Sequence, residues 1–198
     1  DFKFSPLTPK QLSRITSTLG PLEGINLPLS GRATVSTDLQ LKVHQMTFGL
    51  KGGPGTASLH GLFPGTPSLD ISNLQVQGVF NPQLKTLALE EVFVETDGTI
   101  INGNGLIKGE WSHPILEADI TVEHLPVSRI ATIWPQTFAE NARRWITNRI
   151  SDGNVERLDA HLNFQPNAWK NGITDREMIY AQFVVAGSTV NYLPGLPV

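Results

Sequence analysis

Apolar and polar residues alternate strictly along three stretches of the chain. Residues 33–43 carry Ala, Val, Thr, Leu, Leu and Val at odd positions, and Thr, Ser, Asp, Gln, Lys between them. The same period of two recurs in residues 116–123 and 157–164. A period of two gives a half-buried β-strand one apolar and one polar face. We therefore predict a strand in each stretch.

Weaker alternation runs through four further stretches, and turn sequences separate many of them. These stretches are residues 57–63, 74–80, 87–93 and 180–186. The sequences between them are rich in Gly, Pro, Asn and Asp, which are typical of turns. The spacing predicts eight to ten strands. The predicted fold class is mainly β, with a meandering, antiparallel and curved sheet that forms either a groove or a sandwich-like core.

Two stretches have helical spacing. Residues 8–20 begin with Thr-Pro-Lys-Gln, place Leu and Ile on one face and end at Gly-Pro, which predicts a short N-terminal helix. Residues 126–152 predict a helix-turn-helix insert between two strands. The second helix of this insert is expected to begin with a capping box formed by Thr137 and Glu140.

The second predicted helix of the insert has one apolar and one polar face. Phe138, Trp145 and Ile146 share the apolar face, and we expect them to pack onto the sheet. Arg143 and Arg144 are interpreted as the polar face, with a phosphate-binding or headgroup-binding role as the alternative. Truncation of a fully buried Trp145 to Ala is expected to cost about 3–5 kcal/mol, and truncation of Arg143 far less.

These patterns predict a single β-rich segment, residues 1–198. It divides into an N-terminal helix and lead-in (1–22), antiparallel strands (30–124), the helical insert (126–152) and further strands (154–198).

Composition excludes several classes of function. The 198 residues contain 15 Lys and Arg against 18 Asp and Glu, a net charge of −3, and the basic residues do not cluster. Charge-driven binding of nucleic acid or of an anionic membrane is therefore not expected. The absence of Cys excludes disulfides and thiolate sites. No apolar run exceeds four residues, whereas a membrane-spanning helix needs ~20.

The histidines were considered as metal ligands or general bases. None of the five lies in an HExxH motif or another spaced ligand motif. Asp159 and His161 are two residues apart on one predicted strand, where both are expected to point to solvent. We therefore predict no metal site.

Paired acidic residues and a Gly-rich stretch were considered as catalytic or phosphate-binding elements. Glu90 with Glu91, and Glu117 with Asp119, are possible glycosidase carboxylates, but acids on exposed strand faces are common without catalysis. Residues 103–109 miss the GxGxxG spacing and are predicted to form a hairpin turn. We predict no catalytic residues and no cofactor.

Three short segments resemble a pattern of one bacterial protein family. They are IWPQ at 133–136, NARRWI at 141–146 and ISDG at 150–153, followed by VNYLPGLP at 190–197. They resemble the WP, (A)R.W(I/V), (D/G)G and v.Y.pglP motifs of AsmA-like envelope proteins, specifically the YhdP-like branch related to TamB. The resemblance covers roughly residues 30–198.

The resemblance implies an internal segment of a long periplasmic protein that is anchored in the inner membrane. Such proteins are thought to form an elongated, curled β-sheet whose apolar groove carries phospholipid acyl chains toward the outer membrane. Phospholipid and the rest of the same polypeptide are then the expected partners.

The apolar faces of the predicted strands must be covered by another sheet or by a ligand. A closed, packed core would make the chain a structural or partner-binding domain of the envelope. An open groove would make it a lipid conduit. For the conduit, the predicted lining residues are those on the apolar face with the strictest alternation: Leu116, Ala118, Ile120 and Val122.

Overall fold

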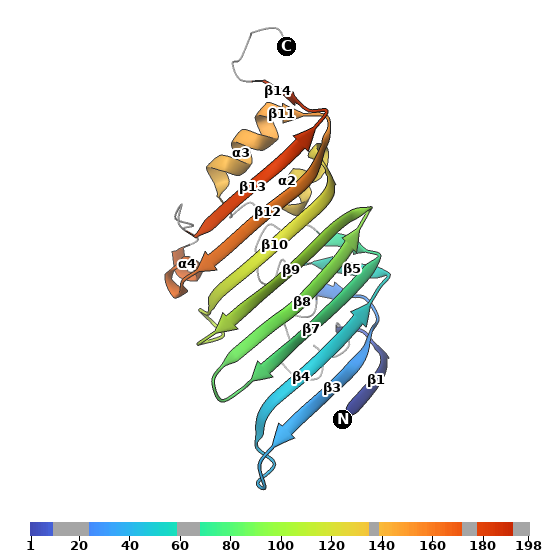
Figure 1. The fold of residues 1–198 in the computed structure, drawn as a ribbon, viewed down its shortest axis with the longest axis vertical. Helices are drawn as coiled ribbons and strands as arrows, with labels where there is room; N and C mark the ends of the chain where they lie inside the picture. The colour runs from blue at the N-terminus through green and yellow to red at the C-terminus, as the bar shows by residue number, and fades with distance from the viewer. Residues whose placement is uncertain (10–23, 59–67, 135–138, 172–177, 192–198) are drawn as a thin grey trace.

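A nine-stranded antiparallel sheet forms the body of the molecule (Figure 1). The structure is a computed structural model, and it describes residues 1–9, 24–58, 68–134, 139–171 and 178–191. The strands follow one another across the sheet in sequence order. They are β1 (Phe2–Leu7), β3 (Leu29–Thr37), β4 (Val43–Gly52), β7 (Asn73–Asn81), β8 (Thr86–Thr96), β9 (Thr99–Lys108), β10 (Ile115–Pro126), β12 (Asn154–Phe164) and β13 (Ile179–Ala186).

Every neighbouring pair of strands in this sheet is antiparallel. The two edge strands, β1 and β13, do not pair with each other, so the sheet is not closed. Its strands are stacked along the long axis of the molecule and inclined to it (Figure 1). The predicted mainly β, meandering antiparallel fold is confirmed.

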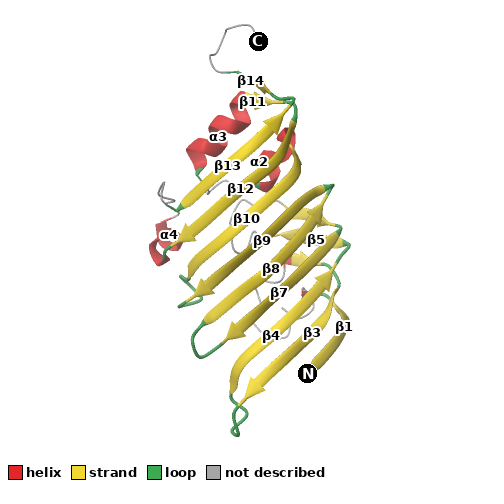
Figure 2. Cartoon of the chain, viewed as in Figure 1, coloured by secondary structure: helices red, strands yellow, loops and turns green. Residues whose placement is uncertain are grey.

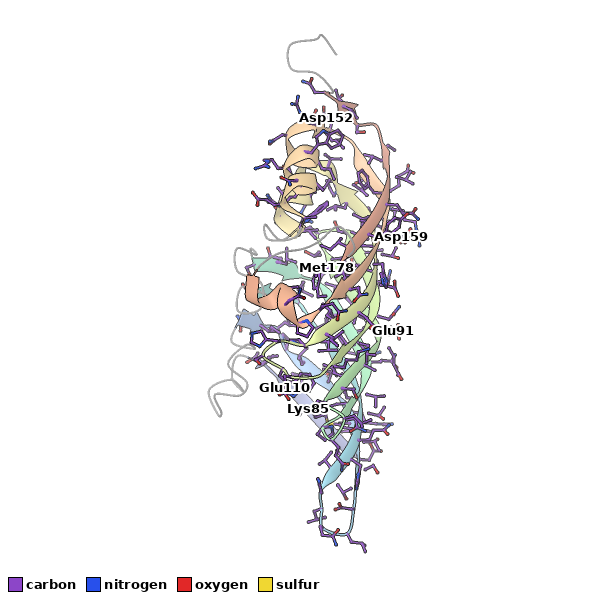
Figure 3. The ribbon with its side chains drawn as sticks, turned by 90° about the vertical axis from the view of Figure 1, so that its left-hand side faces the viewer. Lys85, Glu91, Glu110, Asp152, Asp159 and Met178 are labelled. Carbon is purple, nitrogen blue, oxygen red and sulfur yellow. The ribbon has the colours of Figure 1, made fainter. Side chains whose placement is uncertain are left out.

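Short elements supplement the sheet (Figure 2). A three-stranded sheet consists of β2 (Ile25–Asn26), β5 (Gly55–Ser58) and β6 (Ser68–Ile71), and β11 (Ile150–Ser151) pairs with β14 (Thr189–Val190). The helices are η2 (Val127–Arg129), α2 (Ile130–Ile133), α3 (Glu140–Arg149) and α4 (Pro166–Asn171). In the edge-on view, α3, α4 and the three-stranded sheet lie on one side of the main sheet (Figure 3).

The predicted strand over residues 33–43 is wrong at its C-terminal end. Strand β3 ends at Thr37, and the chain turns at residues 38–42 before β4 begins. The Asp38 carboxylate accepts hydrogen bonds from the backbone N–H groups of Gln40 and Lys42, which closes the turn. Apolar and polar residues keep alternating through the turn. Their alternation therefore does not show that the Asp38 side chain closes a turn here.

The helical insert is confirmed, and its start differs from the prediction. It comprises η2, α2 and α3 between β10 and β12. The N-cap of α3 is Ala139, which is left-handed at φ 45°, and Glu140 is the first helical residue, so Glu140 is not at the third position of a capping box. Thr137, Phe138 and residues 10–20 of the predicted N-terminal helix lie outside the described residues.

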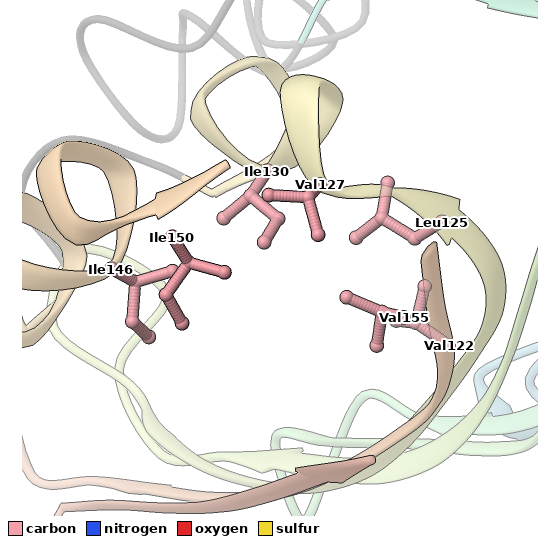
Figure 4. Packing of buried hydrophobic residues seen from close by; sticks show 7 residues of the cluster. All are labelled: Val122, Leu125, Val127, Ile130, Ile146, Ile150 and Val155. Atoms are coloured by element: carbon pink, nitrogen blue, oxygen red, sulfur yellow. The ribbon is translucent and has the colours of Figure 1, made fainter. Parts of the chain in front are cut away.

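The insert packs onto β10 and β12 through a buried apolar cluster (Figure 4). Its members are Val122, Leu125, Val127, Ile130, Ile146, Ile150 and Val155. Ile146 is buried, at 6% exposed, but Trp145 is 44% exposed, so the condition of full burial on which its expected cost of truncation depends is not met. Consecutive residues of a helix point about 100° apart. The buried side of α3 is the one that carries Ile146, so the neighbouring Trp145 points partly to solvent.

Candidate functional site

One face of β10 carries the four residues predicted to line a groove. Leu116, Ala118, Ile120 and Val122 lie directly opposite apolar or glycine residues of both neighbouring strands. Directly opposite residues of an antiparallel pair share a face. The predicted apolar surface of β10 therefore continues onto β9 and β12.

The same register extends this surface over eight of the nine strands as four parallel rows. The first row is Val35, Met46, Phe80, Leu87, Ile107, Leu116 and Phe164, and the second is Ala33, Phe48, Gly78, Leu89, Gly105, Ala118, Leu162 and Ile179. The third is Gly31, Leu50, Val76, Val92, Gly103, Ile120, Ala160 and Ala181, and the fourth is Leu29, Gly52, Leu74, Val94, Ile101, Val122, Leu158 and Phe183. We call these four rows the apolar face. Every position in it is apolar or glycine.

A β-bulge in β8 keeps the apolar face continuous. The register shifts between Leu89 and Val92, so that one extra residue is accommodated at Glu90 and Glu91. The shift places Val92 in the third row and turns Phe93 to the opposite face, where it pairs with Gln75 and Asn102. A bulge resets which residues face the core. Simple alternation through residues 87–93 would have placed Phe93 on the apolar face.

Small side chains concentrate in the two central rows of the apolar face. These rows contain Ala33, Gly31, Gly78, Gly103, Gly105, Ala118, Ala160 and Ala181. The two outer rows contain only one residue of this size, Gly52. The two central rows therefore mix Gly and Ala with large apolar side chains in equal number, and at Gly78 the ring of Phe48 fills the space that a Cβ would take.

Most of the apolar face is only partly buried. Phe164 and Val122 are 2% and 6% exposed, but nearly all of the other positions in β3 to β12 are half-buried. Leu27 covers the fourth row at Gly52, where an added Cβ would lie 2.6 Å from its side chain. The four β10 residues thus fall into two pairs with different surroundings. Val122 belongs to the packed cluster and Ile120 packs against it, whereas Leu116 and Ala118 lie outside it.

The opposite face of the sheet carries most of its polar side chains, and several of its acids have a hydrogen-bond or ion-pair partner on a neighbouring strand. Glu117 accepts a hydrogen bond from Lys108 at 3.1 Å, and the Asp119 carboxylate lies 2.8 Å from Nδ1 of His161. His161 therefore pairs with Asp119, although the sequence placed it beside Asp159. Glu91 accepts a 2.6 Å hydrogen bond from Gln77. No two of these carboxylates are arranged as a shared acid–base pair.

Asp159 lies in the centre of a small ionic network on this polar face. The Arg157 guanidinium donates two 2.8 Å hydrogen bonds to its carboxylate, and the Thr121 hydroxyl donates a third at 2.8 Å. The Arg157 bonds, followed by the Thr121 bond, lower the pKa of Asp159 below its ordinary value. Among the described residues, no group of three or more His, Asp and Glu side chains could hold a metal ion.

The Gly-rich stretch 103–109 is not the predicted hairpin turn. Residues 103–108 lie within β9, and only Gly109, at φ 93°, belongs to the turn that follows. Gly103 and Gly105 alternate with outward-facing Asn residues, which was the available signal for a strand. These glycines belong to the two central rows of the apolar face.

Arg143 contacts the end of α2, which its interpretation as part of a polar helix face did not indicate. Its guanidinium donates hydrogen bonds to the carbonyl oxygens of Ala131 and Trp134, at the C-terminal end of α2. Arg144 instead lies near Glu140 at 3.6 Å and is largely exposed. The two arginines are therefore not equivalent, and Arg143 is committed to holding α3 against α2.

An open cleft of about 450 Å³ lies beside the turn between β8 and β9. Asp70, Glu95 and Asp97 line it, and Arg129 forms a 3.0 Å ion pair with Asp97. None of its lining residues belongs to the four rows of the apolar face.

Comparisons with protein-family models, with curated proteins and with solved structures found no match to this chain. None of the helices in the described parts of the chain is long and apolar enough to span a membrane.

Proposed function

We propose that this chain is a lipid-shielding segment of an AsmA-like protein, which holds phospholipid acyl chains on its apolar face as they pass between the inner and outer membranes. In this role the segment is not an enzyme and needs no cofactor. It acts in the periplasm, within a polypeptide anchored in the inner membrane. The observation that carries the proposal is the apolar face, which has no polar or charged side chain over eight strands and is largely half-buried. Apolar surface of this extent needs a covering layer or a ligand.

The dimensions of the apolar face suit an acyl chain. Eight strands are separated by seven spacings, which at about 4.8 Å each gives a length of roughly 34 Å. One leaflet of a bilayer accommodates its acyl chains in about half of a ~30 Å hydrocarbon core. The two central rows run along this length, so a chain lying over them would have the outer rows of apolar side chains on both sides.

The energetics require no charged partner. Each methylene removed from water contributes about 0.8 kcal/mol, and no side chain of the apolar face can form an ion pair. Binding is therefore expected to be insensitive to salt and to the charge of the headgroup, unlike an electrostatically recruited lipid site.

A second candidate is a structural or partner-binding domain of the envelope that binds no lipid. The packed cluster under the helical insert favours it, because there the chain itself covers the apolar face at Val122. If such covering extended over the central strands, no surface would be left for an acyl chain.

Site-specific photo-crosslinking in cells distinguishes the two candidates. Val92 and Phe93 are consecutive residues on opposite faces of the central strand β8, so a benzoylphenylalanine at each position forms a matched pair. Ile120 and Thr121 form a second pair closer to the packed cluster. We expect phospholipid to be captured at Val92, less at Ile120, and not at Phe93 or Thr121.

The result that contradicts the lipid proposal is equally specific. If neither Val92 nor Ile120 captures phospholipid in the full-length protein, and organic extracts of the purified protein contain none by mass spectrometry, the structural role replaces it. Equal capture at Val92 and Phe93 would indicate nonspecific contact with membranes.

A further inference from the structure

The turn between β3 and β4 exposes two large apolar side chains. It lies at the lower end of the molecule in Figure 1, at the tip of a two-stranded hairpin that projects from the sheet. Leu39 is 97% exposed and Leu41 is 80% exposed. We call residues 38–42 the hairpin tip. Single exposed leucines are ordinary, but two leucines at the end of a projecting hairpin form a small exposed apolar patch.

Most of the backbone N–H groups of the hairpin tip donate hydrogen bonds within the tip itself. The Asp38 carboxylate accepts from the N–H of Gln40 at 3.0 Å and of Lys42 at 2.8 Å. The N–H of Leu41 donates to the Asp38 carbonyl oxygen, and the N–H of Asp38 donates to that of Lys42. A turn with internally satisfied donors enters an apolar medium at lower cost than one whose donors need water.

The backbone of Leu41 has a conformation that disfavours leucine. Its φ is 61°, in the left-handed region, where Gly or Asn is normal and a bulky side chain is strained. The exposed side chain gains little packing in return. A strained, exposed leucine in a turn that Asn would fit better is a reason to look for a function.

The hairpin tip is continuous with the apolar face. Val35 and Met46 pair directly across the hairpin and begin the first row of that face. Val43, which is 36% exposed, lies between this pair and the tip. Apolar side chains therefore lead from the face to the end of the hairpin.

We propose that the hairpin tip inserts Leu39 and Leu41 into the apolar edge of a lipid bilayer. A bilayer suits this feature better than a protein partner, because a stable protein interface needs about 800 Å² per partner and a complementary shape, which two side chains on a narrow hairpin do not supply. Lys42 is exposed beside them, at the level of lipid headgroups when the leucines are inserted. A role of this insertion in lipid transfer rests on the proposed function, but the insertion itself can be tested separately.

The test uses single cysteines carrying an environment-sensitive NBD fluorophore, which label uniquely because the chain has no Cys. The purified chain with Leu39→Cys is mixed with vesicles of phosphatidylethanolamine and phosphatidylglycerol. We expect NBD emission to rise and shift to shorter wavelength, at low and at high salt. Val184→Cys on β13, at a position 58% exposed, is the matched control and should not respond.

The double variant Leu39→Ser, Leu41→Asn should reduce vesicle flotation by about tenfold, since both inserting side chains are lost. The single variant Leu41→Asn separates insertion from folding. It should weaken vesicle binding and at the same time raise the urea midpoint of unfolding, because Asn tolerates the left-handed backbone.

Three outcomes would overturn the insertion. They are an unchanged NBD signal at position 39, an equal response at position 184, and undiminished flotation of the double variant. A dimer that the double variant converts to monomer in sedimentation would assign the tip to contact between copies. Phospholipid capture at Val92 tests the apolar face alone. A failure of the proposed function can therefore be distinguished from a failure of the insertion.

Discussion

The Nε–H of Arg143 donates a hydrogen bond of 3.1 Å to the carbonyl oxygen of Trp134, and the same guanidinium reaches the carbonyl of Ala131 at 2.9 Å. Both carbonyls belong to the last turn of α2 and its C-cap. Because carbonyls at a helix end lack partners within the helix, a cation that bonds to them stabilises the end and fixes α3 beside it.

We expect Arg143→Ala to lower the free energy of unfolding by about 1–3 kcal/mol, since it removes hydrogen bonds from a charged donor. Arg144→Ala is the matched control. Its ion pair with Glu140 is solvent-exposed, so a loss below about 0.5 kcal/mol is expected. Urea unfolding followed by circular dichroism measures both. Equal losses would show that Arg143 does not hold the two helices together.

Ile146→Ala should lower the free energy of unfolding by about 2–4 kcal/mol, because it leaves a cavity in the packed cluster. Trp145→Ala should cost less, since nearly half of that side chain remains in water. This reverses the importance that the sequence assigned to Trp145. A larger loss at Trp145 than at Ile146 in the same urea experiment would contradict the observed orientation of α3.

Glycines on the two faces of the sheet should respond oppositely to alanine. A Cβ at Gly78, on the apolar face, would lie 2.4 Å from the carbonyl oxygen of Ala88, so Gly78→Ala should cost about 1–3 kcal/mol. A Cβ at Gly49, on the polar face, would meet nothing within 4 Å. Gly49→Ala should therefore stabilise the protein by about 0.5–1 kcal/mol through reduced freedom of the unfolded chain. Thermal melts of the two variants check the signs.

Asp159 should contribute to the acid sensitivity of the fold. Its pKa is lowered below the ordinary value of 3.8, first by the hydrogen bonds from Arg157 and then by that from Thr121. A depressed carboxyl pKa in the folded state adds stability that is fully present above pH 3.8 and is lost as the pH falls below it.

Unfolding midpoints measured from about pH 5 to about pH 2.5 should therefore fall less steeply for Asp159→Asn than for the parent. Thr121→Val, which removes one donor, should move the Asp159 titration upward in an NMR experiment. Identical acid profiles for parent and Asp159→Asn would show that the network does not depress this pKa in solution.

The sequence by itself determined the fold class and which side chains of β10 and β12 share the apolar face. Strict alternation in residues 116–123 and 157–164 is a local property that assigns each side chain to a face, and β10 and β12 follow it residue by residue. The helical insert was predictable for the same reason, because its spacing is contained within about 25 residues. The binding of phospholipid and the membership of a family remain predictions.

The tertiary structure decided what depends on neighbouring strands and helices. The bulge at Glu90 and Glu91 is defined by the register with β7 and β9, and it alone determines that Val92 rather than Phe93 joins the apolar face. Likewise, Arg143 became structural only because the end of α2 lies beside α3. Alternation and helical spacing record how a residue relates to its own element, whereas pairing across strands and helix ends depends on residues distant in the chain.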